Sequence, residues 1–293
     1  MSAAVRPIER VPLAALLCGA VAIAFAPIFF RWSETGASAT AFWRLALASP
    51  LLWLLARREG SVAAAGDARL LVAAGIFFAG DLVSWHWSLA LSSVANATLL
   101  ANVAPVFVVI GGWLLYRRTV TPLFLAGMAG AIAGAAVLMD ASWSLSPARL
   151  LGDAFGIVTA AFYGAYMLCI DRLGGRRTTL AVMAWSTPVS ALACLPFALA
   201  EDAPFLPPSA HGWAVLAGLA LVAQVIGQTL VAYGLARLPV HFGSVALLLQ
   251  PATAALLAWA LVGEPMGGQQ AIGAAVILAG IVMARRGAAA RAR

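Results

Sequence analysis

Long apolar stretches recur along nearly the whole chain, and no other feature limits its fold so strongly. A membrane-spanning helix needs about 20 consecutive, mainly apolar residues. Ten stretches of about this length, separated by short connections, cover residues 12–30, 38–56, 70–91, 94–116, 122–139, 151–170, 179–199, 212–235, 240–262 and 269–284. The sequence therefore predicts an all-α integral membrane protein with ten transmembrane helices and no sizeable soluble domain.

The composition excludes the usual soluble classes. Hydrophobic residues make up 63% of the 293 residues and charged residues only 10%, whereas soluble domains carry about 25% charged residues. A soluble enzyme and a disordered chain are both excluded, because neither is so apolar. The net charge of +7 comes from arginines in the connections between apolar stretches. We therefore expect the lipid bilayer, and no nucleic acid, as the partner of this chain.

The arginines also predict an orientation. When the N-terminus is placed in the cytoplasm, 15 of the 18 basic residues fall in cytoplasmic segments. Only Arg31 and Arg149 then lie outside, and Arg44 lies within the second stretch. This asymmetry favours ten spans with both termini in the cytoplasm. The use of arginine alone is typical of GC-rich bacterial genomes, so we expect a multi-pass protein of the bacterial inner membrane.

The chain contains an internal repeat with an offset of 146 residues. Trp87-Ser-Leu-Ala aligns with Tyr233-Gly-Leu-Ala, Pro105 with Pro251, and Gly127 with Gly273, without a gap from about residue 50 to 137. Residues 1–145 and 146–293 then hold five spans each. Because five is odd, the two halves enter the membrane in opposite senses. Inverted repeats are typical of alternating-access carriers, whose substrate site lies near the membrane midplane. A duplication without a transport role is the alternative.

Three segments carry a resemblance to a known family. Asn96-Ala-Thr-Leu-Leu-Ala-Asn-Val-Ala-Pro-Val-Phe107 resembles the fourth-span pattern of the EamA family of the drug/metabolite transporter (DMT) superfamily. Ser244-Val-Ala-Leu-Leu-Leu-Gln-Pro251 is its counterpart in the second half, and Val262-Gly-Glu-Pro265 resembles the family's Gly-Glu-Pro turn. The first half departs from that turn, because Arg118 stands where the repeat places Glu264.

Within this family, the chain is most similar to the YddG-type exporters of aromatic amino acids. The resemblance implies a basket of eight helices around a central cavity, with the fifth and tenth spans as scaffold. Spans five and ten are free of Trp, Tyr, Asp and His, and they carry small residues at four-residue spacings, such as Gly127 with Ala131 and Gly130 with Gly134. Such spacings favour close packing of membrane helices.

Two charged residues lie within the spans. Asp81 is near the middle of the third span and Arg44 lies in the second. An ionisable residue at membrane depth is by default a functional candidate, so Asp81 is predicted to bind a proton or the amine of a substrate. A structural ion pair between Asp81 and Arg44, or an Asp81 that faces a water-filled vestibule, is the alternative reading.

Aromatic and amide side chains complete the predicted substrate-binding set. Each of them can serve instead in interhelical hydrogen bonds or as an interface anchor. The set consists of Phe25, Trp43, Trp85, His86, Asn102, Tyr163, Trp185, Gln224, Gln228 and Gln250. Helix bends near such a site are predicted at Pro27, Pro105, Pro188 and Pro251.

These features together predict a secondary transporter that exports amino acids, such as Trp, Phe and Met, or related small metabolites. A permease for other metabolites or drugs, such as nucleobases or vitamins, is the alternative, and a membrane-embedded enzyme fits less well. The sequence contains no HExxH, GxSxG or nucleotide-binding loop, and its three cysteines lack CxxC spacing. We therefore expect no catalytic residue, metal or cofactor. A monomer is sufficient, because one chain holds both halves.

Overall fold

The computed structural model describes residues 9–61, 66–92, 94–139, 147–257, 260 and 267–289. Within these residues the chain is helical and has no β-strand. Eight helices are long and apolar enough to cross a membrane, and they coincide with the first four predicted spans, with spans six to eight and with span ten. The fifth predicted span is a shorter apolar helix, Pro122–Leu138. The ninth lies partly outside the described residues, and the turn at 262–265 lies outside them entirely.

Several predicted spans are built from more than one helical segment. The first half consists of α1 (Arg10–Ile23), α2 (Ala26–Trp32), α3 (Ala37–Arg58), α4 (Ala68–Leu91), α5 (Val94–Ala101), α6 (Ala104–Tyr116) and α7 (Pro122–Met139). The second half consists of α8 (Pro147–Leu173), α9 (Thr179–Ala200), α10 (Ala210–Leu219), the π-helix η1 (Ala220–Gln228), α11 (Thr229–Leu235), α12 (Val240–Ala246), α13 (Leu249–Leu257) and α14 (Gly268–Ala289).

Three of the four prolines predicted to bend helices lie next to helix breaks. Pro27 and Pro105 each occupy the first turn of a helix that follows a short break, in α2 and α6 respectively. Pro251 lies in the first turn of α13, after the break that follows α12. This placement is expected, because proline has no N–H and is tolerated in the first turn. Pro188 lies inside α9, which is one uninterrupted helix, so a bend there stays a prediction.

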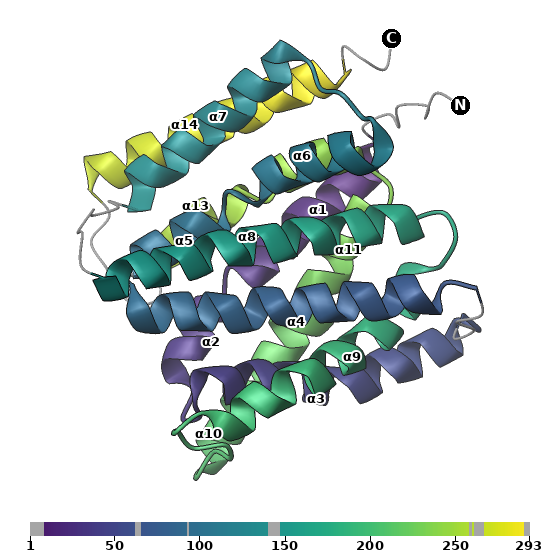
Figure 1. The fold of residues 1–293 in the computed structure, drawn as a ribbon, viewed down its shortest axis with the longest axis vertical. Helices are drawn as coiled ribbons and strands as arrows, with labels where there is room; N and C mark the ends of the chain where they lie inside the picture. The colour runs from purple at the N-terminus through teal and green to yellow at the C-terminus, as the bar shows by residue number, and fades with distance from the viewer. Residues whose placement is uncertain are drawn as a thin grey trace.

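Helices from the two halves of the sequence pack against each other in pairs. The most extensive contacts join α7 with α14, α4 with α8, and α3 with α9, and α1 packs on α11 and η1. Figure 1 shows α7 and α14 side by side at one end of the molecule, beyond the layer that contains α6. The pair is antiparallel, because Gly127 near the start of α7 faces Ala284 near the end of α14, and Gly287 faces Phe124.

Helices α3 and α9 are joined by hydrogen bonds at both ends. Glu201, directly after α9, accepts hydrogen bonds from the backbone N–H groups of Ala37 (3.0 Å) and Ser38 (2.7 Å) in the first turn of α3. Glu59, directly after α3, accepts one from the hydroxyl of Thr178, the N-cap of α9 (2.7 Å). Each helix therefore ends at the start of the other, so the two run antiparallel, and a glutamate supplies the acceptor at each junction.

The helix bounds give two different offsets between the two parts of the chain. Helices α3 and α9 both have 22 residues and begin 142 residues apart, and α4 and α10 also begin 142 residues apart. The separation is 146 residues for α5 and α12 and for α7 and α14. The second half therefore holds four more residues between the start of its third span and the start of its fourth. This stretch contains η1, and a π-helix accommodates extra residues within a continuous helix.

Candidate functional site

A cavity lies among helices from both halves of the chain. The space open to the centre of a water molecule is about 160 Å³, which is enough for several waters or a small solute. Its wall is mainly apolar and is formed by Ile23, Ala24, Ala26, Pro27, Arg44, Phe78, Asp81, Leu82, Trp85, Thr98, Ala101, Asn102, Thr159, Tyr163, Gln228, Gln250, Pro251 and Ala254. These residues come from α1, α2 and the junction between them, from α3, α4, α5 and the junction of α5 with α6, and from α8, η1 and α13.

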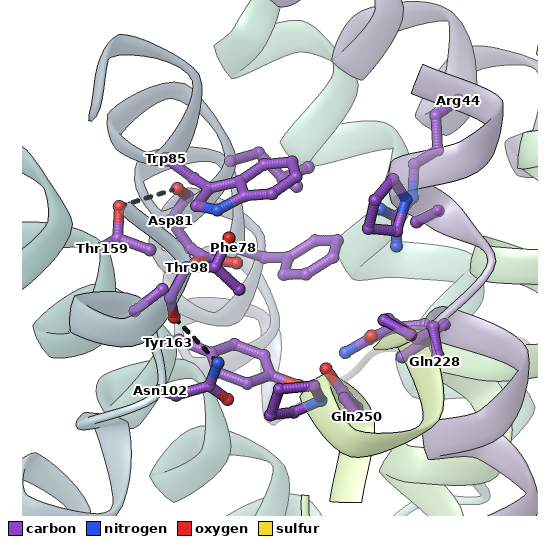
Figure 2. A pocket seen from close by; sticks show the side chains of 18 residues that line it. Arg44, Phe78, Asp81, Trp85, Thr98, Asn102, Thr159, Tyr163, Gln228 and Gln250 are labelled. Carbon is purple, nitrogen blue, oxygen red and sulfur yellow. Dashed lines mark hydrogen bonds between the residues drawn. The ribbon is translucent and has the colours of Figure 1, made fainter. Parts of the chain in front are cut away.

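One face of α4 forms a wall of this cavity. Phe78, Asp81 and Trp85 follow at intervals of three and four residues, which places them on the same side of an α-helix, and Figure 2 shows all three directed at the cavity. The Asp81 carboxylate makes no hydrogen bond or ion pair with any described residue; only its backbone oxygen has a partner, the Thr159 hydroxyl at 3.5 Å. Among the described residues, this acid at membrane depth therefore has no direct hydrogen-bond or ion-pair partner for its carboxylate.

Arg44 lines the cavity from α3, and a hydrogen bond to Gln224 holds its guanidinium in place. Its Nε donates to Oε1 of Gln224 (3.1 Å), and Nε2 of Gln224 lies 3.5 Å from the hydroxyl of Thr187. The guanidinium also lies 5.9 Å from the ring centroid of Phe78, within cation–π range. Among the described residues Arg44 forms no ion pair with Asp81. The two groups therefore form no direct ion pair within 4.0 Å, although they still attract each other electrostatically.

Amide and aromatic side chains form the remaining polar wall. Asn102 donates through Nδ2 to the backbone oxygen of Thr98 (2.8 Å), one turn back on α5. Tyr163 stacks on Tyr166, whose hydroxyl accepts from Nε2 of Gln228 (3.1 Å). The Nε2 of Gln250 is buried without a hydrogen-bond partner among the described residues, although Gln250 lines the cavity (Figure 2). A buried donor without a partner is a natural place for a ligand acceptor.

Several predicted site residues lie elsewhere. His86 is buried in contact with the rings of Phe30 and Trp85 and is not among the lining residues. Trp43 donates to the backbone oxygen of Phe205 (2.8 Å) and packs against other aromatic rings near the start of α10. Trp185 packs on Trp53. Phe25, Pro105, Pro188 and Gln224 also lie outside the lining set, although Gln224 is hydrogen-bonded to Arg44.

Nine of the 18 lining residues were not predicted from the sequence, and three of these nine carry an aromatic ring or a hydroxyl group. Phe78 shares the face of α4 with Asp81, so its three-residue spacing from Asp81 is a signal that was available. Thr98 and Thr159 line the cavity from α5 and α8. Threonine is common in membrane helices as a partner for backbone oxygens, so its presence alone carries no signal for a cavity.

Ion pairs join the connections at one end of the molecule. Asp67 at the start of α4 accepts from Nε of Arg177 (2.9 Å) and from Nη1 of Arg176 (3.2 Å), both in the connection between α8 and α9. The hydrogen bond from Arg177, followed by that from Arg176, holds the pKa of Asp67 below its ordinary value. The two halves of the chain are thus joined here by charge.

The apolar helices define a multi-pass membrane protein, and the cavity, whose mainly apolar wall contains Arg44 and Asp81, is its candidate site for a small solute. Comparison with known proteins gives the family. The sequence pattern of the EamA-like transporter family matches residues 11–139 and 150–286. The chain therefore belongs to the EamA-like transporter family, as its sequence motifs predict.

Individual relatives are more distant. A protein of Streptantibioticus cattleyicolor described as a probable terminal-alkyne amino-acid exporter is 29% identical over 71% of this chain and 69% of its own length. The pseudopaline exporter CntI of Pseudomonas aeruginosa is 24% identical over 64% of each chain. An uncharacterized transporter of Archaeoglobus fulgidus is 25% identical over 74% of this chain and 77% of its own.

A solved crystal structure among those that match shows the same fold. It aligns with a TM-score of 0.80 over 92% of this chain and 96% of its own, at 20% sequence identity. At this identity the likeness concerns the fold alone. The comparisons and the helices together describe a membrane transporter that handles a small molecule within the bilayer.

Proposed function

We propose that this chain is a secondary transporter that exports amino acids, above all aromatic and apolar ones such as Trp, Phe and Met, or related small metabolites. The observation that carries the proposal is the cavity, in which an acid, a base and aromatic rings face one mainly apolar space. Such a wall suits a small, partly apolar solute that carries charges. Two relatives bear names of exporters, one for a terminal-alkyne amino acid and one for pseudopaline.

The proposed architecture is a pair of inverted five-helix halves, residues 1–145 and 146–293, that together form ten spans around the cavity. The family pattern matches once in each half. Helices at corresponding places in the two halves, α3 with α9 and α7 with α14, pack as antiparallel pairs, which is what opposed halves require. Alternating access then consists of rocking one half against the other around a central site.

The proposed setting is the bacterial inner membrane, with both termini in the cytoplasm and the monomer as the working unit. The distribution of arginines supports this orientation. It places Asp67, Arg176 and Arg177 on the cytoplasmic side, and Glu201 with the start of α3 on the periplasmic side. A cysteine-accessibility experiment with a membrane-impermeant reagent on intact cells tests the assignment at both ends.

The decisive experiment is uptake of labelled tryptophan into proteoliposomes, with and without an imposed pH gradient. We expect uptake above that of empty liposomes, with competition by Phe and Met. A substitution that fills the cavity, Ala101→Phe, is expected to abolish this uptake. Ala129→Phe, which adds the same ring to an exposed position on α7, is the matched control and is expected to leave uptake intact.

The outcome also decides between substrates. Tryptophan uptake no greater than that of empty liposomes would contradict the amino-acid assignment. The same proteoliposomes would then be assayed with nucleobases, vitamins and cationic drugs, the alternative substrates for a cavity of this kind. Uptake that survives Ala101→Phe would instead show that the substrate does not pass through this cavity.

A further inference from the structure

Two ionisable side chains of opposite sign in the cavity, Arg44 and Asp81, have hydrogen-bonding atoms without a partner among the described residues. Arginine has five N–H donors, and among the described residues only Nε of Arg44 has a hydrogen-bond partner. The Asp81 carboxylate, which has two acceptor oxygens, has none. Unpaired charges at membrane depth are costly and are retained where they serve a function. Among the described residues, neither group has a partner of opposite charge within 4.0 Å, although the two attract each other across the cavity.

The side chains of Arg44 and Asp81 are not paired directly with each other. No ion pair within the 4.0 Å limit joins Arg44 and Asp81 in the described structure. Figure 2 shows them on opposite sides of the cavity, with the ring of Phe78 directed into the space between them. The Phe78 ring also lies against the guanidinium. A ligand that pairs with both charges must therefore carry two opposite charges and span this space.

Arg44 is fixed in place before any ligand binds. Gln224, which is completely buried in η1, accepts its Nε hydrogen bond and is in turn close to Thr187 on α9. This arrangement holds the guanidinium on the cavity wall and limits its rotation. A preorganised donor loses less conformational entropy when it binds a ligand. Gln224 is therefore a positioning residue, which acts on the ligand through Arg44.

We infer that the cavity recognises zwitterionic solutes, such as free amino acids, with the ligand carboxylate on Arg44 and the ligand ammonium on Asp81. The inference rests on the proposed function and sharpens it. It excludes amines without a carboxylate, acids without an amine, and uncharged ring compounds as good ligands. Trp85 and Tyr163 then provide aromatic surface for the apolar side chain.

The test measures binding, so that it stands apart from transport. Purified full-length protein in lipid nanodiscs is titrated with tryptophan, tryptamine, indole-3-propionate and indole, and with methionine and its two single-charge analogues. Displacement of labelled tryptophan or methionine gives the affinities. Because a hydrogen bond to a charged group changes an equilibrium constant by about 10- to 150-fold, each zwitterion is expected to bind at least about tenfold more tightly than either of its single-charge analogues.

Variants then assign each charge to its partner. Arg44→Gln is expected to lower the affinity for tryptophan to that for tryptamine, and to leave the affinity for tryptamine itself unchanged. Asp81→Asn is expected to lower the affinity for tryptophan to that for indole-3-propionate. Arg57→Gln, at the exposed end of the same helix as Arg44, and Asp202→Asn, at an exposed position after α9, are the matched controls.

Gln224→Leu separates positioning from simple packing. If Gln224 orients Arg44, this variant weakens binding of tryptophan but not of tryptamine, which has no carboxylate for Arg44 to hold. A purely structural role would weaken both ligands together. Size-exclusion profiles and thermal unfolding without ligand show whether each variant is folded.

Two results would overturn the inference. One is binding of a single-charge analogue as tight as that of its parent zwitterion, and the other is the absence of measurable binding of either zwitterion. The first leaves amino-acid export intact if tryptophan is still taken up by proteoliposomes. Conversely, zwitterion-selective binding without tryptophan uptake would contradict the proposed export of tryptophan and leave the recognition scheme standing.

Discussion

Close packing of α7 on α14 gives a sharp test of the described fold. A Cβ atom added at Gly127 would lie 2.7 Å from the backbone oxygen of Gly280, and closer still to the backbone nitrogen of Ala284. A Cβ added at Gly130, one turn further along α7, would meet only the Cα of Gly280 at 3.9 Å, an ordinary van der Waals contact. The same substitution to alanine should therefore have opposite effects at the two positions.

The magnitude follows from two opposing contributions. Alanine stabilises the interior of a helix by up to about 1 kcal/mol relative to glycine, and this gain is shared by both positions. At Gly127 the obstructing atoms belong to the backbone, so α14 has to move away, and overpacking of this kind costs about 1–3 kcal/mol. Gly130→Ala is expected to be neutral or slightly stabilising. Gly127→Ala is expected to be less stable than Gly130→Ala by about 1–3 kcal/mol, because the helix propensities cancel in the comparison.

The assay is equilibrium unfolding in mixed micelles, with SDS as the denaturant and the two variants measured beside the parent protein. The free energy of unfolding is compared at one SDS concentration within the transition, which avoids a long extrapolation. Equal stability of Gly127→Ala and Gly130→Ala would refute the backbone contact between these helices. A variant Gly130→Ala that is the less stable of the two would refute the helical register described for this pair.

The remaining predictions concern single groups. Glu201→Ala should lower the free energy of unfolding by about 1–2 kcal/mol, because two N–H groups at the start of α3 lose their acceptor, whereas its exposed neighbour Asp202→Asn should be neutral in the same unfolding titration. Because the pKa of Asp67 is held below its ordinary value of 3.8 by Arg177, its ion pairs should stabilise the protein above about pH 4 and be lost as the pH falls through the lowered pKa. The stability difference between the parent and Asp67→Asn should therefore stay constant from pH 8 to 5 and shrink in stronger acid. If transport is coupled to protons, Asp81→Asn should abolish the stimulation of uptake by a pH gradient, since asparagine binds no proton; unchanged stimulation would remove Asp81 from the coupling step.

The helical membrane fold could be predicted from the sequence because the bilayer imposes one simple requirement on it. Each span must be long and apolar, so span limits follow from hydropathy alone, and eight predicted spans coincide with helices of sufficient length. Some of the helix breaks could be predicted from the sequence, because Pro27, Pro105 and Pro251 lie beside them. The π-helix was not predicted. It depends on which backbone hydrogen bonds form within an apolar segment, and its residues are of the same types as those in the α-helices around it.

The sequence predicted which polar residue types line the candidate site better than it predicted which face of each helix lines it. Asp81, Arg44, Gln228 and Gln250 were singled out because polar groups at membrane depth are rare, and all four line the cavity. Aromatic residues were harder to assign. Trp85 and His86 are adjacent in sequence, yet only Trp85 lines the cavity, because consecutive residues of a helix point in different directions. In an apolar span both sides of a helix look alike, since lipid and protein interior are equally apolar.

The charges of the cavity are distributed unevenly between the two halves of the chain. Arg44 and Asp81 both belong to the first half, whereas the second half contributes the neutral amides of Gln228 and Gln250 to the wall. The amide of Gln224 holds Arg44 from across the interface between the halves. Under the proposed rocking mechanism this bond changes whenever the halves move, because its donor and acceptor belong to different moving bodies. The orientation of Arg44, and with it the affinity for a carboxylate, would then differ between the two sides of the membrane, which gives an exporter a physical means to release its substrate.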